Sequence, residues 1–418
     1  MEKDAFIFIP GISQEFADQS FENMARRIAL AFERQAETAN FRFSVKITNE
    51  SFRFSDQRET QYQMATILRE NNDEPVPLID FYELEYHSLL TKDYYSKNLL
   101  INAFRLFLVI IINIPRIFWL FFGKEKRAKT LTEKLQGLYA IGILSLLIVY
   151  AVILLIAGMD IIIQVFNNFL EFDPPNWLEF NPPNWLIFLR NSEVIVIFVA
   201  LVEIVQPNIK EVWIKSAIQY VSIVEYLSLG TNKSVIKGKL TNFIENVAEK
   251  SEYKNIHIIA YSFGTIVAID TIFPIKNMPT QRINSVNTLV TIGCPIDFIR
   301  LLWKDYFSNR KGIANIPKRW INIYSSIDIL ASNFRDDNKD SEAEKNINLT
   351  NLTLEQQTKP ENNIYSSGID NNNLSLITWL ALIGLRTHTM YWEKNFQSEV
   401  NCFDLLILAM YKNSDFLK

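Results

Sequence analysis

The sequence predicts an α/β protein with a mostly parallel, doubly wound sheet, into which a helical transmembrane hairpin is inserted. Two observations predict the sheet. Short apolar runs end at turn residues and alternate with longer amphipathic stretches. An isoleucine-rich run at 255–260 also leads into a sharp turn and then a helix. A third observation predicts the insertion: residues 138–159 form a run of 22 positions without a charge, long enough to cross a bilayer.

Residues 1–95 are expected to form the N-terminal part of the α/β domain. The run Ala-Phe-Ile-Phe-Ile at 5–9 is typical of a buried strand and is stopped by Pro10-Gly11. Residues 41–47 alternate apolar and polar side chains, which predicts a half-exposed strand. The polar run at 57–72 predicts a helix, and residues 77–84 predict a further strand.

Residues 96–207 are expected to form a membrane insertion, which begins with a helix at about 99–122. That helix is apolar, but Asn102, Arg105, Asn113 and Arg116 recur along it. The pairs 102/113 and 105/116 are eleven residues apart, close to three whole helical turns, so they define one polar stripe. We therefore expect an interfacial helix that lies on the membrane and does not cross it.

Two later segments of the insertion are expected to cross the bilayer, at about 138–159 and 185–205. The second contains charged residues only near its ends. The stretch 124–134 holds five lysines and arginines, whereas the loop 160–185 holds none. The two segments therefore predict a multi-pass membrane protein with two crossings, and the positive-inside rule places its α/β domain on the cytoplasmic side. Small residues in the first segment would permit a homo-oligomer through the hairpin, although they form no close-packing motif.

Residues 208–418 are expected to form the C-terminal part of the α/β domain. Strands are predicted at 286–292 and 320–325, and a final helix at about 404–411. Between them, residues 335–373 are dominated by Asp, Asn, Lys, Glu and Thr, which predicts a mobile surface loop.

Composition excludes several classes of function. The net charge is −4 and no long basic patch is present, so we expect no nucleic-acid partner. Two cysteines among 418 residues cannot make a disulfide framework or a zinc site, and three histidines disfavour histidine-based metal binding, so we expect no metal. The chemistry that the sequence favours below also needs no cofactor.

The most informative stretch is Ala260-Tyr-Ser-Phe-Gly264, which lies between the isoleucine-rich strand and the following helix. A serine on such a strand-to-helix turn is exposed at the carboxyl edge of the sheet, and its neighbours two positions away must be small because the two backbones nearly touch there. The pattern is A-x-S-x-G, with alanine in place of the first glycine. Ser262 is thus a candidate nucleophile; the alternative is a serine that caps a core helix.

An acyl-transfer serine needs a base and an acid that orients the base. The chain supplies Ser262, Asp328 and His388 in that order. Asp328 follows the end of a predicted strand, and His388 lies in a late loop. Asp297 also follows a strand end and remains a rival for the acid. His257 lies inside the strand that leads to the serine and is expected to be a packed residue.

Stabilisation of a developing oxyanion requires two backbone N–H donors. We expect one from Phe263, directly after the nucleophile, and the other from Gly11 or Ile12, in the turn after the first strand. A glycine at that turn would let the backbone approach a substrate closely.

Together these pieces resemble an α/β-hydrolase of the serine lipase/esterase type. The matching segments are 6–11, 258–264, 291–295, 320–328 and 388–391. The resemblance implies an eight-stranded, mostly parallel sheet with the triad on loops at its carboxyl edge. The chain departs from the family pattern at Ala260, and at Pro10, where a histidine commonly precedes the oxyanion glycine.

The expected function is that of a membrane-anchored serine hydrolase that cleaves carboxylic esters of membrane lipids through an acyl-enzyme. Because the insertion follows the strand at 77–84, it leaves the sheet near the edge where the triad is expected, which favours a substrate reached from the lipid bilayer. Two alternatives stay open: a protein or acyl thioesterase, and a catalytically inactive hydrolase-like membrane anchor or assembly platform.

Overall fold

The computed structural model of the chain describes residues 3–12, 21–36, 41–53, 59–70, 75–97, 99–122, 133–142, 144–145, 148, 209–250, 252–334, 347, 349–365, 388, 390–392, 401–412, 414 and 416–417. The chain divides into two compact units. The first contains residues 1–87, 125–137 and 232–418, and the second contains residues 88–124 and 138–231.

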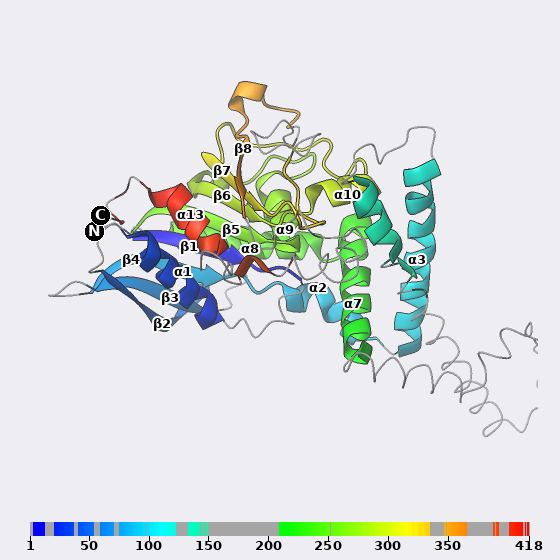
Figure 1. Cartoon of the computed structure of the whole chain (residues 1–418), viewed down its shortest axis with the longest axis horizontal. Helices are drawn as coiled ribbons and strands as arrows, with labels where there is room; N and C mark the ends of the chain where they lie inside the picture. Colours follow the sequence, from blue (N-terminus) through cyan, green and yellow to red (C-terminus); the bar gives the residue numbers. More distant parts are fainter. Residues whose placement is uncertain are drawn as a thin grey trace, which may run out of the picture. The chain divides into compact units, whose positions relative to one another are not determined.

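The first unit is built on an eight-stranded sheet with the strand order β2-β3-β4-β1-β5-β6-β7-β8 (Figure 1). The six strands from β4 to β8 along this order run parallel, and β3 is antiparallel to both β2 and β4. The strands are β1 (Lys3–Ile9), β2 (Arg42–Arg53), β3 (Glu59–Glu70), β4 (Val76–Glu83), β5 (Tyr253–Tyr261), β6 (Val286–Ile292), β7 (Arg319–Tyr324) and β8 (Pro360–Ile364). The predicted α/β architecture with a mostly parallel sheet is therefore confirmed.

Helices cover both faces of this sheet, which explains why its central strands are mostly apolar. On one face, α1 (Phe21–Gln35) and α13 (Cys402–Tyr411) share a core with side chains of β1, β4, β5, β6 and β7. Arg34 on α1 donates two hydrogen bonds, both 2.7 Å, to the buried carboxylate of Asp404 on α13. On the other face lie α8 (Lys233–Ala248) and α9 (Phe263–Ile272), where Phe243 packs against Phe52 and Tyr82 of the sheet. Shorter elements of this unit are α10 (Ile296–Leu302), η4 (Gln281–Ser285), η5 (Leu354–Gln356) and η8 (Met390–Trp392).

The helix predicted at 57–72 is wrong, because this stretch forms β3. Its side chains alternate: Gln61 and Gln63 are exposed, whereas Tyr62 and Met64 are buried. The segment also contains good helix formers, and for this reason the alternation of exposed and buried positions was not recognised in the sequence. Pairing on both sides, with β2 and β4, and burial of one face outweigh the local helix preference.

The mobile loop predicted at about 335–373 is also corrected, since residues 349–365 are ordered against the sheet and include the edge strand β8. Polar pairs hold this strand. The Asn322 amide of β7 donates to the side-chain oxygen of Asn362 at 3.0 Å, and Arg319 forms an ion pair with Glu361 at 2.6 Å. A strand held by polar side chains at a sheet edge lacks the apolar pattern by which strands are recognised.

The second unit contains α2 (His87–Tyr95), α3 (Leu99–Phe122), α7 (Ile209–Val224) and the π-helical turn η3 (Glu225–Leu229). The helix predicted at 99–122 is confirmed with the same bounds. Of the predicted crossing at about 138–159, residues 138–142, 144–145 and 148 are described and are helical, whereas the one at about 185–205 lies outside the described residues. In the part of the chain that is described, no helix is both long enough and apolar enough to span a membrane.

Candidate active site

Ser262 lies on the sharp turn between β5 and α9, as the sequence predicts. Its backbone has φ 52° and ψ −127°, a conformation that non-glycine residues rarely adopt. The cost of such strain is about 1–3 kcal/mol, and it persists where surrounding contacts fix it. Here the Ser262 N–H donates to the Ile292 carbonyl at the end of β6, at 2.9 Å. The turn thereby holds the serine at the carboxyl edge of the sheet.

The two small residues that flank this turn differ in how strictly they are required. A Cβ atom on Gly264 would lie 2.4 Å from the Ile9 carbonyl oxygen and 2.5 Å from that of Pro10, so glycine is needed where α9 crosses the end of β1. Ala260 is fully buried within β5, opposite Ile9 and Thr291 of the neighbouring strands. The methyl group that departs from the G-x-S-x-G pattern is accommodated there.

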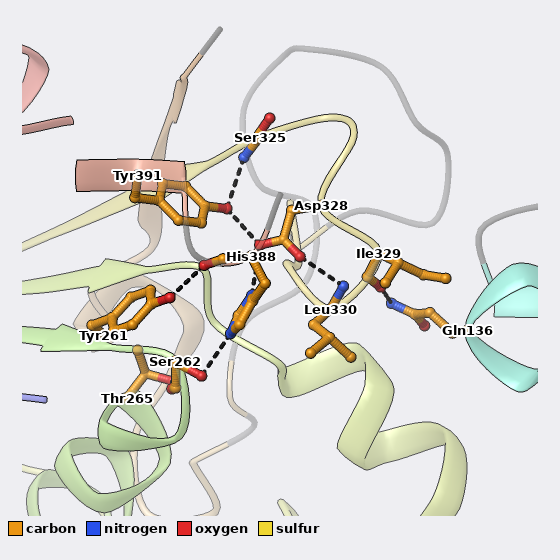
Figure 2. A network of polar contacts seen from close by, with 10 residues as sticks. All are labelled: Gln136, Tyr261, Ser262, Thr265, Ser325, Asp328, Ile329, Leu330, His388 and Tyr391. Carbon is orange, nitrogen blue, oxygen red and sulfur yellow. Dashed lines mark hydrogen bonds and ion pairs between the residues drawn. The ribbon is translucent and has the colours of Figure 1, made fainter. Parts of the chain in front are cut away.

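The three residues predicted for the triad come together (Figure 2). The distance from His388 Nε2 to Ser262 Oγ is 2.6 Å, and that from His388 Nδ1 to Asp328 Oδ2 is 2.8 Å. All three side chains are buried. Ser262 follows β5, Asp328 follows β7, and His388 comes after β8, so residues 126 positions apart meet at one edge of the sheet.

The Asp328 carboxylate accepts two hydrogen bonds besides the one from His388. The Tyr391 hydroxyl donates to Oδ2 at 2.7 Å, and the Leu330 N–H donates to Oδ1 at 3.0 Å. Burial raises the pKa of Tyr391 well above its usual range, with the negative charge of Asp328 adding to the effect. The phenol therefore keeps its proton and serves as a donor at any physiological pH.

His388 is held by aromatic neighbours. The Tyr261 hydroxyl donates to the His388 carbonyl, and the two rings are stacked with centroids 5.5 Å apart and planes inclined by 23°. Gly293, with φ 57°, lies at the other side of the imidazole. A Cβ there would be 3.3 Å from His388 Cε1 and 3.4 Å from Asp328 Oδ2, so this glycine lets the pair lie against the end of β6.

The other candidates for acid and base lie elsewhere. Asp297, the rival acid, accepts a hydrogen bond from Ser332 and lies 3.4 Å from Arg300. His257 contacts the buried Asp4, with Nε2 3.3 Å from Oδ2, among side chains of β1 and β5. The structure thus brings Asp328, and not Asp297, to His388.

The backbone groups predicted for the oxyanion hole lie beside the nucleophile. Phe263 is the first residue of α9. Gly11 approaches the turn so closely that a Cβ would be 2.9 Å from both Ser262 Cβ and Tyr261 Cδ1, and Ile12 next to it is buried. The close approach expected of a glycine at this turn is therefore present.

Cys294 is the other nucleophilic side chain near the serine. Thr265 donates from its hydroxyl to Cys294 Sγ at 3.2 Å. Burial raises the pKa of the Cys294 thiol to about 12, so the thiol stays protonated and unreactive.

Two of the contacts around the triad were not predicted from the sequence. Tyr391 is three residues after His388, a spacing that could have suggested a shared turn, but nothing local marks its hydroxyl as a partner of Asp328. The buried Gln136 side chain donates to the Ile329 carbonyl at 2.9 Å, directly after the acid. Gln136 is almost two hundred positions away in the chain, and no sequence pattern links it to this loop.

Replacing Tyr391 by Phe is expected to lower kcat by about tenfold, since a hydrogen bond to a charged group contributes roughly 1.5–3 kcal/mol and the other donors retain part of it. Without this donor, the Leu330 N–H and His388 remain to hold the Asp328 carboxylate in its orientation. A fall in kcat at an unchanged melting temperature would show that Tyr391 orients the acid, whereas a lower melting temperature with a normal kcat would show a purely structural role. Both quantities are measured.

An activated serine, a base and an oriented acid are the groups that acyl transfer requires. Within the described segments, no group of three or more His, Cys, Asp or Glu is arranged to hold a metal ion. Comparison with family models, with curated proteins and with solved structures finds no match to this chain.

Proposed function

We propose that this chain is a serine ester hydrolase with an α/β-hydrolase fold. The observation that carries the proposal is the pair of hydrogen bonds that links the three side chains. His388 Nε2 lies 2.6 Å from Ser262 Oγ, and His388 Nδ1 lies 2.8 Å from Asp328 Oδ2. The strained turn after β5 and the order of the three residues along the chain support the same assignment.

In the proposed reaction, His388 Nε2 takes the hydroxyl proton of Ser262 as Oγ bonds to the ester carbonyl carbon. The oxyanion that forms is stabilised by backbone N–H groups, for which Phe263 and Gly11 or Ile12 are the candidates. The imidazolium then returns the proton to the leaving alcohol as the C–O bond breaks, which leaves an acyl-serine. Water activated by the same imidazole releases the carboxylic acid and restores Ser262. Asp328 stabilises the imidazolium in both halves of the reaction.

The proposed substrate is a carboxylic ester of a membrane lipid. The uncharged run at about 138–159, the largely apolar run at about 185–205 and the basic stretch before them support a multi-pass protein whose hydrolase domain is cytoplasmic. An enzyme held in this way would reach its ester from the bilayer, so hydrolysis of lipid in vesicles should exceed hydrolysis of a short soluble ester.

The test of the chemistry is covalent labelling of the detergent-purified full chain by a fluorophosphonate probe, which reacts with activated serines. We expect labelling of the wild type and its loss in Ser262→Ala and His388→Ala, since one removes the nucleophile and the other its base. Ser285→Ala is a matched control: this hydroxyl is outside the site and donates to the Arg282 carbonyl, so labelling should persist.

Absence of labelling in the wild type, both in detergent and in vesicles, would contradict the proposal and favour the inactive anchor. If the wild type is labelled, turnover of phospholipid vesicles and of an acyl thioester, measured side by side, distinguishes the lipase from the thioesterase. A faster reaction with the thioester would overturn the proposed substrate class and leave the triad in place.

A further inference from the structure

The polar side chains of the long helix α3 turn toward the rest of the second unit, whereas many of its apolar side chains are exposed. A helix on the surface of a protein in water has the opposite arrangement. In the polar stripe, Asn102, Arg105 and Arg116 bond to other segments of the unit, and Asn113 is buried and donates to the Val109 carbonyl within the helix. The apolar Leu106 also lies on this inward side. A helix that lay by itself at a membrane surface would turn the stripe toward water, whereas here the stripe contacts protein.

Ion pairing and hydrogen bonds within the unit hold the residues of the stripe. Arg105 makes a bidentate contact with the Glu225 carboxylate of η3, with Nη2 2.6 Å from Oε1 and 2.7 Å from Oε2. The Asn102 amide donates to the Tyr94 carbonyl at 2.8 Å, and Arg116 donates to Ser228 at 3.2 Å. The stripe therefore fastens α3 to its neighbours, in the way that polar groups join helices in an apolar medium.

The opposite side of α3 is a continuous apolar surface, which we call the outer face. Its side chains are 41–56% exposed: Ile101, Phe104, Leu108, Ile111, Ile112, Ile114, Phe118 and Trp119. It extends over about 27 Å at 1.5 Å per residue. Soluble proteins rarely leave so long an apolar patch uncovered, so the outer face requires an apolar partner.

Two features of the outer face favour lipid over protein as that partner. Of these eight side chains, only Trp119 carries a hydrogen-bonding group, whereas protein interfaces make about one hydrogen bond per 100–200 Å². The sequence of side chains at its C-terminal end is also that of a membrane boundary. The apolar residues give way to the aromatic pair Phe118 and Trp119, and five lysines and arginines follow between positions 124 and 134.

We infer that the outer face of α3 is embedded in the acyl-chain layer of a bilayer with an anionic surface, while the Arg105–Glu225 pair fixes which side of the helix faces the lipid. This inference rests on one part of the proposed function, namely that the protein is bound to a membrane. It does not depend on whether Ser262 is a nucleophile.

The experiment uses spin labels on the full chain in vesicles of phosphatidylcholine and phosphatidylglycerol. Single cysteines are introduced at the outer face (Phe104→Cys, Leu108→Cys and Ile111→Cys) and labelled. The Ser262→Ala background prevents any hydrolysis of the vesicles. Cys294 and Cys402 are fully buried, and the parent chain, treated with the same reagent, measures any labelling of them. Collisions with oxygen, which concentrates in acyl chains, and with a water-soluble nickel chelate are measured separately.

At the three outer positions we expect frequent oxygen collisions and few with the chelate. Leu106→Cys, on the inward side where Leu106 is fully buried, is the matched control and should collide little with either. Frequent chelate collisions at the outer positions would place them in water, and infrequent collisions with both reagents would place them against protein, either a second copy or another segment of this chain. Either result overturns the inference, whatever the outcome of the fluorophosphonate test.

Discussion

Replacing Asp328 by Asn is expected to lower kcat by about 10⁴-fold, the loss known for this exchange in a serine hydrolase triad. The reason lies in the donors around this carboxylate. The main-chain N–H of Leu330 donates to Oδ1 and cannot turn away, so the asparagine oxygen would remain there. Its NH₂ group would take the place of Oδ2, where the Tyr391 hydroxyl can rotate to accept from it, and would face His388 Nδ1. Nδ1 would then act as an acceptor, and the ring proton would move to Nε2. In that tautomer His388 cannot take the proton of Ser262.

The matched control for this variant is Asp297→Asn. Both aspartates follow a strand end, and the sequence alone left both open as the acid. Because Asp297 contacts Ser332 and Arg300, its replacement should change kcat by no more than about twofold to threefold, a shift that one partly exposed interaction can cause. Pre-steady-state acylation with an activated ester measures the step directly. Equal losses in the two variants, or a near-normal rate in Asp328→Asn, would contradict the assigned acid.

The parts of the site that were predictable are those in which backbone geometry constrains residue type. The strand-to-helix turn requires Gly264 beside Ser262, and acid and base must follow later strands, so chain order alone indicated Asp328 and His388. The aromatic neighbours of the site could not be predicted in this way. Tyr261 and Tyr391 meet His388 and Asp328 through contacts 60 or more positions apart in the chain, and a single sequence carries no signal of such pairing.

The fold was predictable where strands are buried on both faces, because those strands contain runs of apolar residues. The runs at 5–9 in β1, 258–260 in β5 and 289–290 in β6 are of this kind. The two errors, at β3 and β8, lie toward the edges of the sheet. There the side chains are partly polar, and cross-strand partners decide the structure. Which side of α3 faces the protein could not be predicted for a related reason. A polar stripe shows which residues share a side of the helix, but not whether that side contacts water or protein.

Replacing Gly264 by Ala is expected to destabilise the first unit by about 3 kcal/mol or more, at the upper end of the cost of overpacking. The added methyl would lie 2.4 and 2.5 Å from two main-chain carbonyl oxygens, of Ile9 and Pro10, and neither can rotate away as a side chain could. Relief requires that α9 move away from β1. Such a shift would also displace Ser262 from His388, so fluorophosphonate labelling should fall together with the melting temperature.

Gly238→Ala provides the matched control. This glycine lies inside α8, and a Cβ there would meet nothing within 4 Å. The same methyl group should therefore stabilise the protein by about 0.5–1 kcal/mol, because alanine restricts the unfolded chain and favours helix. Thermal unfolding of both variants in detergent, followed by circular dichroism, measures the contrast. If Gly264→Ala unfolds at the same temperature as the wild type, α9 does not lie against the end of β1, and the close strand-to-helix turn that presents Ser262 is not as described.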